Sequence, residues 1–262
     1  MKRRVVLLGI ALTVAIAGGI AAQDTERALQ AYQDRFRDAS PEVKLQILET
    51  ADMLSVEELG PLYEQAVQFV LSNAEDIETN VILRDIALYA VEKIGEGGYS
   101  PATGSLWTLF VEYEDDTARI LILDVLGSIG GGDAELVLDL NGWVQAQINL
   151  YRGGVMPDQQ VLRNAVQTVG ELEDTSSFPV LLDVQLAQIS DAITEEAAIA
   201  MEALPGDYAQ QAITAINNRG VARREPALDY FITDSGLSDE QRARIAAGVL
   251  AEALREVLRD PA

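Results

Sequence analysis

Apolar side chains recur every three or four residues along most of the chain, which is the period of an amphipathic α-helix. Ala, Leu, Glu, Gln and Arg dominate these stretches, and all of them have high helix propensity. Few segments alternate with the period of two that a half-buried strand requires. Turn-forming residues interrupt the pattern at short intervals: Ser40-Pro41, Gly95–Gly98, Gly130–Asp133, Gly153-Gly154, Pro205-Gly206 and Ser235-Gly236. The pattern predicts an all-α fold of short helices.

Several predicted helices begin with residues that cap backbone amides. Ser55–Glu58 and Ser238–Gln241 match the capping box, in which a serine and an acidic or amide side chain satisfy each other's free N–H groups. Ser40-Pro41 and Ser100-Pro101 place serine at the cap and proline in the first turn, where a missing N–H is tolerated.

Apolar residues with the same internal spacing recur as four complete sets and two shortened ones, beginning 35 to 46 residues apart. The sets are Ile47/Leu48/Ala51/Leu54, Ala87/Leu88/Val91/Ile94, Ile122/Leu123/Leu126/Ile129, Ala165/Val166/Val169/Leu172, Ala200/Met201/Leu204 and Ala246/Ala247/Leu250. A second amphipathic helix is expected after each of the first five: Glu57–Leu71, Thr103–Glu114, Ala134–Tyr151, Pro179–Ile189 and Tyr208–Asn217. A period of this length is typical of two-helix repeats, whose pairs stack to bury a shared core.

Three segments resemble HEAT repeats. Val161–Leu172 is the best match, with an apolar-Arg start, a small residue at Ala165 and a Val-Gly pair before an acidic turn. Asp116–Ile129 and Leu83–Leu88 follow the same pattern. The resemblance implies a right-handed α-α superhelix, a HEAT-like solenoid of about five to six helical pairs. The proline that often opens the second helix of a HEAT pair is clear only at Pro179.

The predicted organisation has four parts. Residues 1–22 have the basic, apolar and small-residue order of a signal peptide, with an uncleaved anchor as the alternative. Residues 23–39 form an N-terminal capping helix, residues 40–220 form HEAT-like repeats, and residues 221–262 form a further repeat or capping helices. We therefore expect a periplasmic or secreted protein, with no membrane span if the signal is cleaved.

The composition excludes several kinds of chemistry. The chain has no cysteine and no histidine, which excludes thiolate and imidazole nucleophiles, disulfides and imidazole metal ligands. Its formal charge of −23 disfavours nucleic acid as a partner. Residues 23–218 carry 9 basic and 34 acidic residues, whereas residues 219–262 carry 7 and 8. The nearly neutral end could therefore interact differently from the acidic body.

Acidic residues cluster at the predicted turns: Glu75–Glu78, Glu112–Asp116, Glu171–Asp174 and Glu195-Glu196. Solubility and favourable interaction with helix dipoles explain such clusters, and attraction of a cation or a basic partner is the alternative. No segment has the ligand spacing of a helix-loop-helix calcium site. The sequence predicts no catalytic, cofactor-binding or metal-binding residues and no cofactor.

Candidate partner-binding residues come from the resemblance. In HEAT-like proteins the second helices line the concave side, where partners bind. On that analogy, the exposed binding residues are those opposite the apolar stripe of the helix 134–151: Asn141, Gln145, Asn149 and Arg152.

Two functions remain open at this stage. The first is an exported, non-enzymatic HEAT-repeat scaffold that mediates protein–protein interaction with a protein partner. The alternative is an α/α-toroid hydrolase that acts on carbohydrate through paired carboxylates.

Overall fold

The computed structural model describes residues 24–51, 54–233 and 236–259. These residues form α-helices and short 3-10 helices joined by turns, and no β-strand occurs among them. The prediction of an all-α fold is confirmed. The predicted signal peptide, residues 1–22, lies outside the described residues. Within the described ranges, no helix combines the length and apolar character needed to cross a bilayer.

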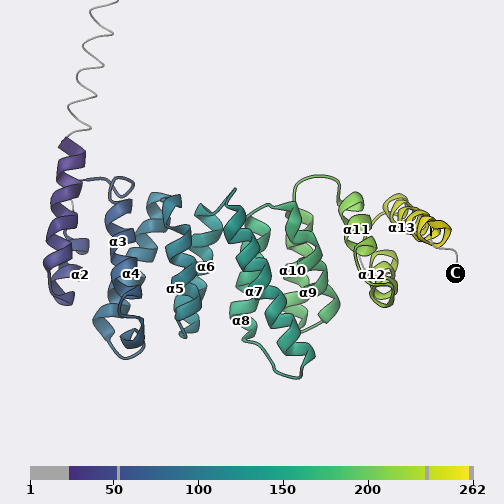
Figure 1. Ribbon diagram of the computed structural model, residues 1–262, viewed down its shortest axis with the longest axis horizontal. Coiled ribbons are helices and arrows are strands. Elements are labelled where there is room, and N and C mark those ends of the chain that lie inside the picture. Colours follow the sequence, from purple (N-terminus) through teal and green to yellow (C-terminus); the bar gives the residue numbers. More distant parts are fainter. Residues whose placement is uncertain (1–23, 52–53, 234–235, 260–262) are drawn as a thin grey trace, which may run out of the picture. The chain divides into compact units, whose positions relative to one another are not determined.

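The helices match the expected ranges closely. The first covers residues 24–38, close to the expected capping helix. It is followed by α2 (Pro41–Glu49), α3 (Gly60–Leu71), α4 (Val81–Gly97), α5 (Thr103–Glu112), α6 (Asp116–Ile129), α7 (Ala134–Arg152), α8 (Gln159–Glu171), α9 (Phe178–Ala187), α10 (Asp191–Ala203), α11 (Tyr208–Asn217), α12 (Val221–Thr233) and α13 (Asp239–Arg259). The 3-10 helices are η1 (Ala74–Asp76), η2 (Ser100–Ala102) and η3 (Thr175–Ser177). Figure 1 labels the helices α2 to α13 and colours the chain by residue number.

The chain divides into two compact units, residues 1–129 and residues 130–262. The division falls inside the segment 40–220, which was expected to be a continuous array of repeats. At this point α6 ends at Ile129, Gly132 adopts a positive φ of 84°, and Asp133 caps α7. The glycines therefore form a turn between helices.

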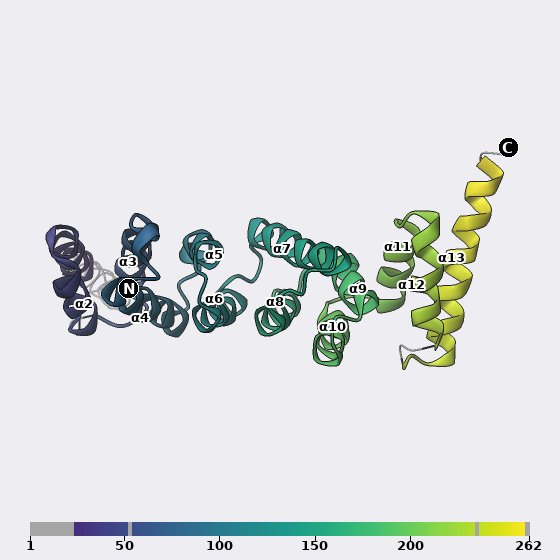
Figure 2. The same cartoon turned by 90° about the horizontal axis from the view of Figure 1, so that it is seen from below.

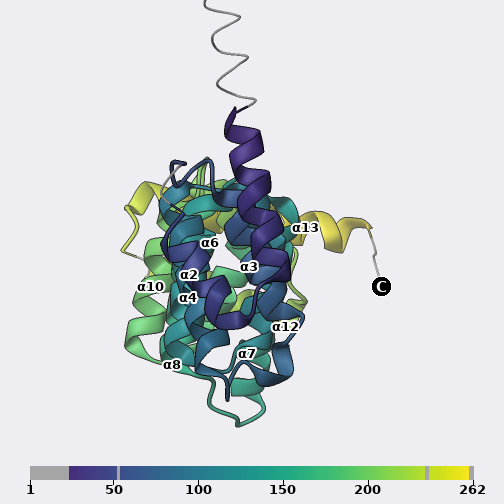
Figure 3. The same cartoon turned by 90° about the vertical axis from the view of Figure 1, so that its left-hand side faces the viewer.

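Unit 1 has two layers of helices. Helix α4 packs against α2 and α6, and α3 packs against α5. In Figure 2, α2, α4 and α6 lie in one row and α3 and α5 in the other. The 24–38 helix, dark purple in Figure 3, is joined to α3 by hydrogen bonds from Gln65 Nε2 to the Gln33 carbonyl and from Gln33 Nε2 to the Pro61 carbonyl.

Unit 2 is also layered. Helix α8 packs against α10, and α9 packs against both α7 and α11. Arg163 on α8 and Glu196 on α10 join the first layer through an ion pair in which Nη2 and Oε2 are 3.0 Å apart. Because Glu196 is only 7% exposed, its carboxylate is not available to other partners.

Unit 1 also has a polar contact between residues far apart in the sequence. Glu78 Oε1 accepts a hydrogen bond from the Glu114 amide, 36 residues away.

The repeated apolar sets supply much of the core. The third, fourth and fifth sets are buried throughout, and Ala87, Val91 and Ile94 of the second set are fully buried. In the first set, Ile47 and Leu48 are buried, whereas Ala51 and Leu54 are half-buried. The sixth set is wrong, because Ala247 and Leu250 are exposed and α13 buries Ile245 and Val249 instead.

The predicted caps are found in three of four places. The reciprocal hydrogen bonds of a capping box form between Ser55 and Glu58 and between Ser238 and Gln241. The first of these boxes stabilises a turn before α3, and the second begins α13. Ser40 is the N-cap of α2 by backbone position, without a side-chain bond. Ser100 is not a cap, because it lies inside η2 and α5 begins only at Thr103.

Helix α13 is held to the rest of unit 2 by two ion pairs. Arg224 donates from Nη1 and Nη2 to Glu256 at 2.6 and 2.8 Å, and Arg244 Nη2 lies 2.7 Å from Asp207 Oδ2. These hydrogen bonds lower the pKa of Glu256 below its ordinary value of 4.5 and that of Asp207 below 3.8. The ionised carboxylates therefore favour the docked position of α13, in addition to its buried residues Ile245 and Val249.

Acid is expected to loosen α13. A carboxylate whose pKa is lower in the folded state stabilises the fold above its unfolded pKa, and this stabilisation is lost as the pH falls through the folded pKa. Thermal unfolding followed by circular dichroism should show a melting temperature that falls as the pH drops below 4.5, the ordinary pKa of Glu256. The double variant Asp207→Asn/Glu256→Gln should show a weaker pH dependence. An unchanged dependence would contradict this account of α13 docking.

Candidate functional site

The four residues predicted to bind a partner lie along one face of α7 but differ in exposure. Asn149 and Arg152 are exposed, whereas Asn141 and Gln145 are half-buried. Asn141 Nδ2 donates to Ser177 Oγ of η3 at 3.0 Å, and Gln145 Nε2 donates to Asn149 Oδ1 at 3.4 Å. The expectation of exposure is therefore wrong for Asn141, which contacts Ser177 of η3, and Gln145 is only partly exposed. The accessible end of the face is at Arg152.

Arg152 lines a cavity of about 230 Å³ in unit 2. The other lining residues come from α9, from the turn after α11 and from α12: Asp183, Leu186, Arg219, Ala222, Arg223 and Pro226. We call this cavity the arginine pocket. Its walls carry three guanidinium groups and one carboxylate, so its local charge is positive. Leu186, Ala222 and Pro226 add apolar surface.

The Arg219 side chain is held in place by contacts within the arginine pocket. Its side chain is 10% exposed, and Nη1 forms an ion pair with Asp183 Oδ1. Its Nη2 donates to the Pro179 carbonyl at 3.2 Å. Its Nε is buried and has no hydrogen-bond acceptor among the described residues. The backbone is held as well, because Arg224 Nε donates to the Arg219 carbonyl at 2.9 Å.

The other two arginines are accessible to a ligand. Arg152 Nη2 forms a long ion pair with Asp183 Oδ1 at 3.8 Å, beyond hydrogen-bond distance, and its side chain is 39% exposed. Arg223 is exposed at the rim. Asp183 thus neutralises the buried Arg219, and Arg152 and Arg223 leave an excess of positive charge. Guanidinium groups in this arrangement are suited to binding a carboxylate or another oxyanion.

Three residues of the arginine pocket stand out in the sequence. Arg152 was a predicted binding residue, and Arg219 and Arg223 belong to the arginine-containing, nearly neutral end. Asp183 was missed. Asp183 could have been identified because it is the one charged residue of the helix Phe178–Ala187, whose other side chains are apolar or carry an amide.

The acidic clusters have structural contacts. Asp115 Oδ1 accepts a hydrogen bond from the Ala118 amide at 2.8 Å near the start of α6. Asp174 caps η3 by accepting from the Ser176 amide at 2.8 Å, and hydrogen bonds from Ser176 lower the pKa of this carboxyl. Across the described residues, no group of three or more acidic side chains is arranged to hold a metal ion. Helix capping and interhelix contacts therefore account for several of these carboxylates.

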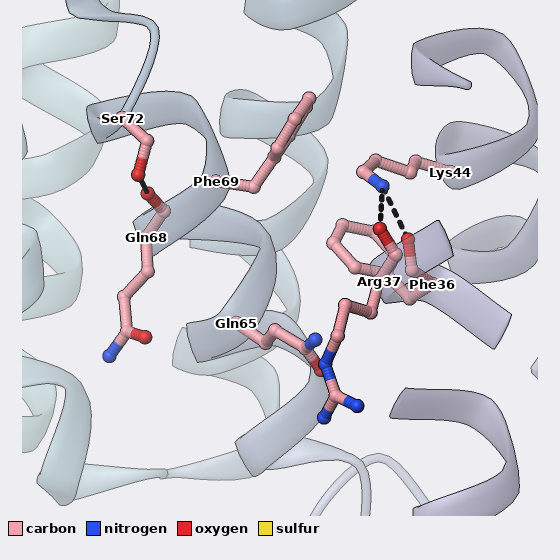
Figure 4. Close-up of a pocket in the computed structure, with 7 residues that line it drawn as sticks. All are labelled: Phe36, Arg37, Lys44, Gln65, Gln68, Phe69 and Ser72. Atoms are coloured by element: carbon pink, nitrogen blue, oxygen red, sulfur yellow. Dashed lines mark hydrogen bonds between the residues drawn. The ribbon is translucent and has the colours of Figure 1, made fainter. Parts of the chain in front are cut away.

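A second cavity, of about 210 Å³, lies beside Lys44 in unit 1. Figure 4 shows the Lys44 ammonium pointing at the backbone carbonyls of Phe36 and Arg37, between the rings of Phe36 and Phe69. Its Nζ also donates to the Ala39 carbonyl at 2.8 Å. Because these carbonyls end the 24–38 helix, Lys44 acts as a cap for that helix. Lys44 is therefore buried and hydrogen-bonded within the fold, whereas Arg152 and Arg223 are exposed.

Neither a protein-family model nor a curated protein matches this chain.

Proposed function

We propose that this chain is a non-enzymatic, HEAT-like helical scaffold that is exported and binds a protein partner. The arginine pocket is the observation that carries the proposal. In a chain whose residues 23–218 carry 34 acidic and 9 basic residues, three arginines and a single carboxylate line one pocket. The layered packing within each unit supports the HEAT-like part of the proposal, because stacked helical pairs present extended side-chain surfaces.

The partner presents a carboxylate to this pocket. The acidic remainder of the chain repels a highly acidic protein, so the pocket selects a local acidic group on a partner that is otherwise neutral or basic. The apolar wall of Leu186, Ala222 and Pro226 favours an acidic side chain with an apolar neighbour. Arg152 and Arg223 form the new hydrogen bonds, and Arg219 remains paired with Asp183.

Removing the two accessible guanidinium groups should abolish partner binding without unfolding the protein. In Arg152→Gln/Arg223→Gln, each lost charge-assisted hydrogen bond costs about 1.5–3 kcal/mol, or roughly ten- to hundredfold in affinity. The measurement is affinity capture from native envelope extract, with the wild type and the variant side by side.

The matched control is Arg27→Gln. Arg27 is also an exposed arginine, with a side chain 79% exposed, and it lies in unit 1. The Arg27→Gln variant should capture the same proteins as the wild type. Identical capture by the wild type and the double variant would contradict a role for the arginine pocket. Failure of the wild type to retain any protein above the background of the resin would contradict the scaffold proposal itself.

A further inference from the structure

Helix α13 has an apolar face that no other part of unit 2 covers. Leu250, Leu254 and Val257 are 60%, 55% and 69% exposed. Ala243 and Ala247 continue the same face and are also exposed. We call these five residues the α13 seam. Ile245 and Val249 lie on a different face of α13 and are buried against the rest of unit 2. The seam is therefore not the face by which α13 packs within its own chain.

The spacing of the α13 seam is that of a coiled coil. Its residues follow one another at intervals of four, three, four and three, the a/d pattern of a heptad repeat. Ala246, Ala251 and Ala253 flank the seam, and their small side chains allow a second helix to approach closely. Leu258, 79% exposed, flanks the seam near the end of α13 and adds to its apolar surface. A surface helix that packs only within its own chain needs a single apolar stripe, whereas α13 has one buried and one exposed.

The charge distribution favours a second copy of this chain as the partner of the seam. Residues 219–262 carry 7 basic and 8 acidic residues, whereas residues 23–218 carry 9 and 34, so the acidic body repels another copy and the end of the chain does not. Several charged residues of α13 are already paired within the chain: Arg242 with Asp239, Arg244 with Asp207, Arg255 with Glu252 and Glu256 with Arg224. A second copy would thus meet a seam with little net charge.

We propose that two copies of this chain associate through antiparallel pairing of their α13 seams. If the pair is centred near Glu252, Leu250 of one copy faces Leu254 of the other, and Ala247 faces Val257. Small and large side chains are then complementary, and the opposed helix dipoles attract. The end of α13 lies beyond α11 and α12 in Figure 2, which leaves it accessible to a second chain.

One helix pair buries less than the roughly 1,600 Å² of a standard interface, so the dimer should be weak, with a dissociation constant of about 10 µM. Sedimentation velocity over a range of protein concentrations measures it. The variant Leu250→Glu/Leu254→Glu should weaken association at least thirtyfold. Leu138→Glu is the control, because Leu138 is a leucine on α7 of the same unit and, at 71%, is more exposed than Leu250 and Leu254. It should leave the dimer unchanged.

Engineered cysteines test the antiparallel geometry, and the natural chain has none to interfere. Ala251→Cys, near the centre of the seam, should form a disulfide-linked dimer on mild oxidation. Ala243→Cys should not, because in an antiparallel pair the two copies of residue 243 lie at opposite ends.

Three results would overturn the proposal. One is a wild type that sediments as a monomer up to about 200 µM. Another is a dimer that the glutamate variant leaves intact. The third is binding of the monomer to vesicles of phosphatidylcholine and phosphatidylglycerol through α13, lost in the glutamate variant, which would assign the seam to a lipid surface.

Discussion

Replacing Gly170 with valine is expected to destabilise unit 2 by about 3 kcal/mol. Gly170 lies on α8 where this helix packs closely against α10. A Cβ atom at this position would lie 2.9 Å from the Cβ and 3.0 Å from the Cα of Ala200. Because one of the opposing atoms belongs to the backbone, a rotamer change cannot relieve the clash and the two helices must separate. The pair Arg163–Glu196 bridges the same two helices and would be strained as well.

Gly142 supplies the control for Gly170. It also lies inside a helix, α7, but a Cβ there meets no atom within 4 Å. Gly142→Ala should therefore stabilise the protein by about 0.5–1 kcal/mol, the usual gain of alanine over glycine in a helix. Urea unfolding of the variants at both positions, followed by circular dichroism, gives their free energies of unfolding for comparison. If Gly170→Ala stabilised the protein as much as Gly142→Ala does, the close approach of α8 and α10 would be refuted.

Replacing Lys44 with methionine is expected to cost about 3 kcal/mol in unit 1. Lys44 is 3% exposed, and its ammonium donates to the carbonyls of Phe36, Arg37 and Ala39. Methionine fills the same space but donates no hydrogen bond, so carbonyls at the end of the 24–38 helix lose their donor. The contacts of the ammonium with the Phe36 and Phe69 rings, at 4.9 and 4.7 Å from their centroids, are lost as well.

Lys93→Met is the control for Lys44. Lys93 forms an ion pair with Glu96 one helical turn away, and the Glu96 side chain is 45% exposed. A pair at the surface contributes about 0–1 kcal/mol, so this variant should melt close to the wild type. Limited proteolysis gives a second readout, since Lys44→Met should make the 24–38 segment the earliest site of cleavage. Equal melting temperatures for the two variants would show that Lys44 does not cap the helix.

The sequence predicted which segments are helical better than it predicted which faces they bury. The range Tyr208–Asn217 is the same in the prediction and in the structure, because Asp207 and a single apolar stripe define that helix. On α13 two apolar stripes compete, and the repeat register selected Ala247 and Leu250 over the buried Ile245 and Val249. Periodicity identifies a stripe, but only the neighbouring helices decide which of two stripes becomes core.

The candidate site was harder to predict for a related reason. Arg152, Asp183 and Arg219 come from different helices or turns, and the spacing of apolar residues says nothing about which polar side chains meet. Asn141 is an example of a residue that was expected to be exposed but contacts another part of the chain. Its position opposite the apolar stripe of α7 indicated exposure, but η3 supplies Ser177 as a neighbour and covers it.

The long-range polar pairs of both units span nearly the same length of chain. Glu78 and Glu114 are 36 residues apart, Arg163 and Glu196 are 33 apart, and Asp183 and Arg219 are 36 apart. The entropy lost in closing a loop depends on the number of residues enclosed and rises by about 0.6 kcal/mol for each doubling. Each of these pairs therefore closes a loop of similar entropic cost wherever it lies in the chain. None of these contacts closes a longer loop elsewhere in its unit, so the entropic cost of each does not depend on how many helices the unit contains.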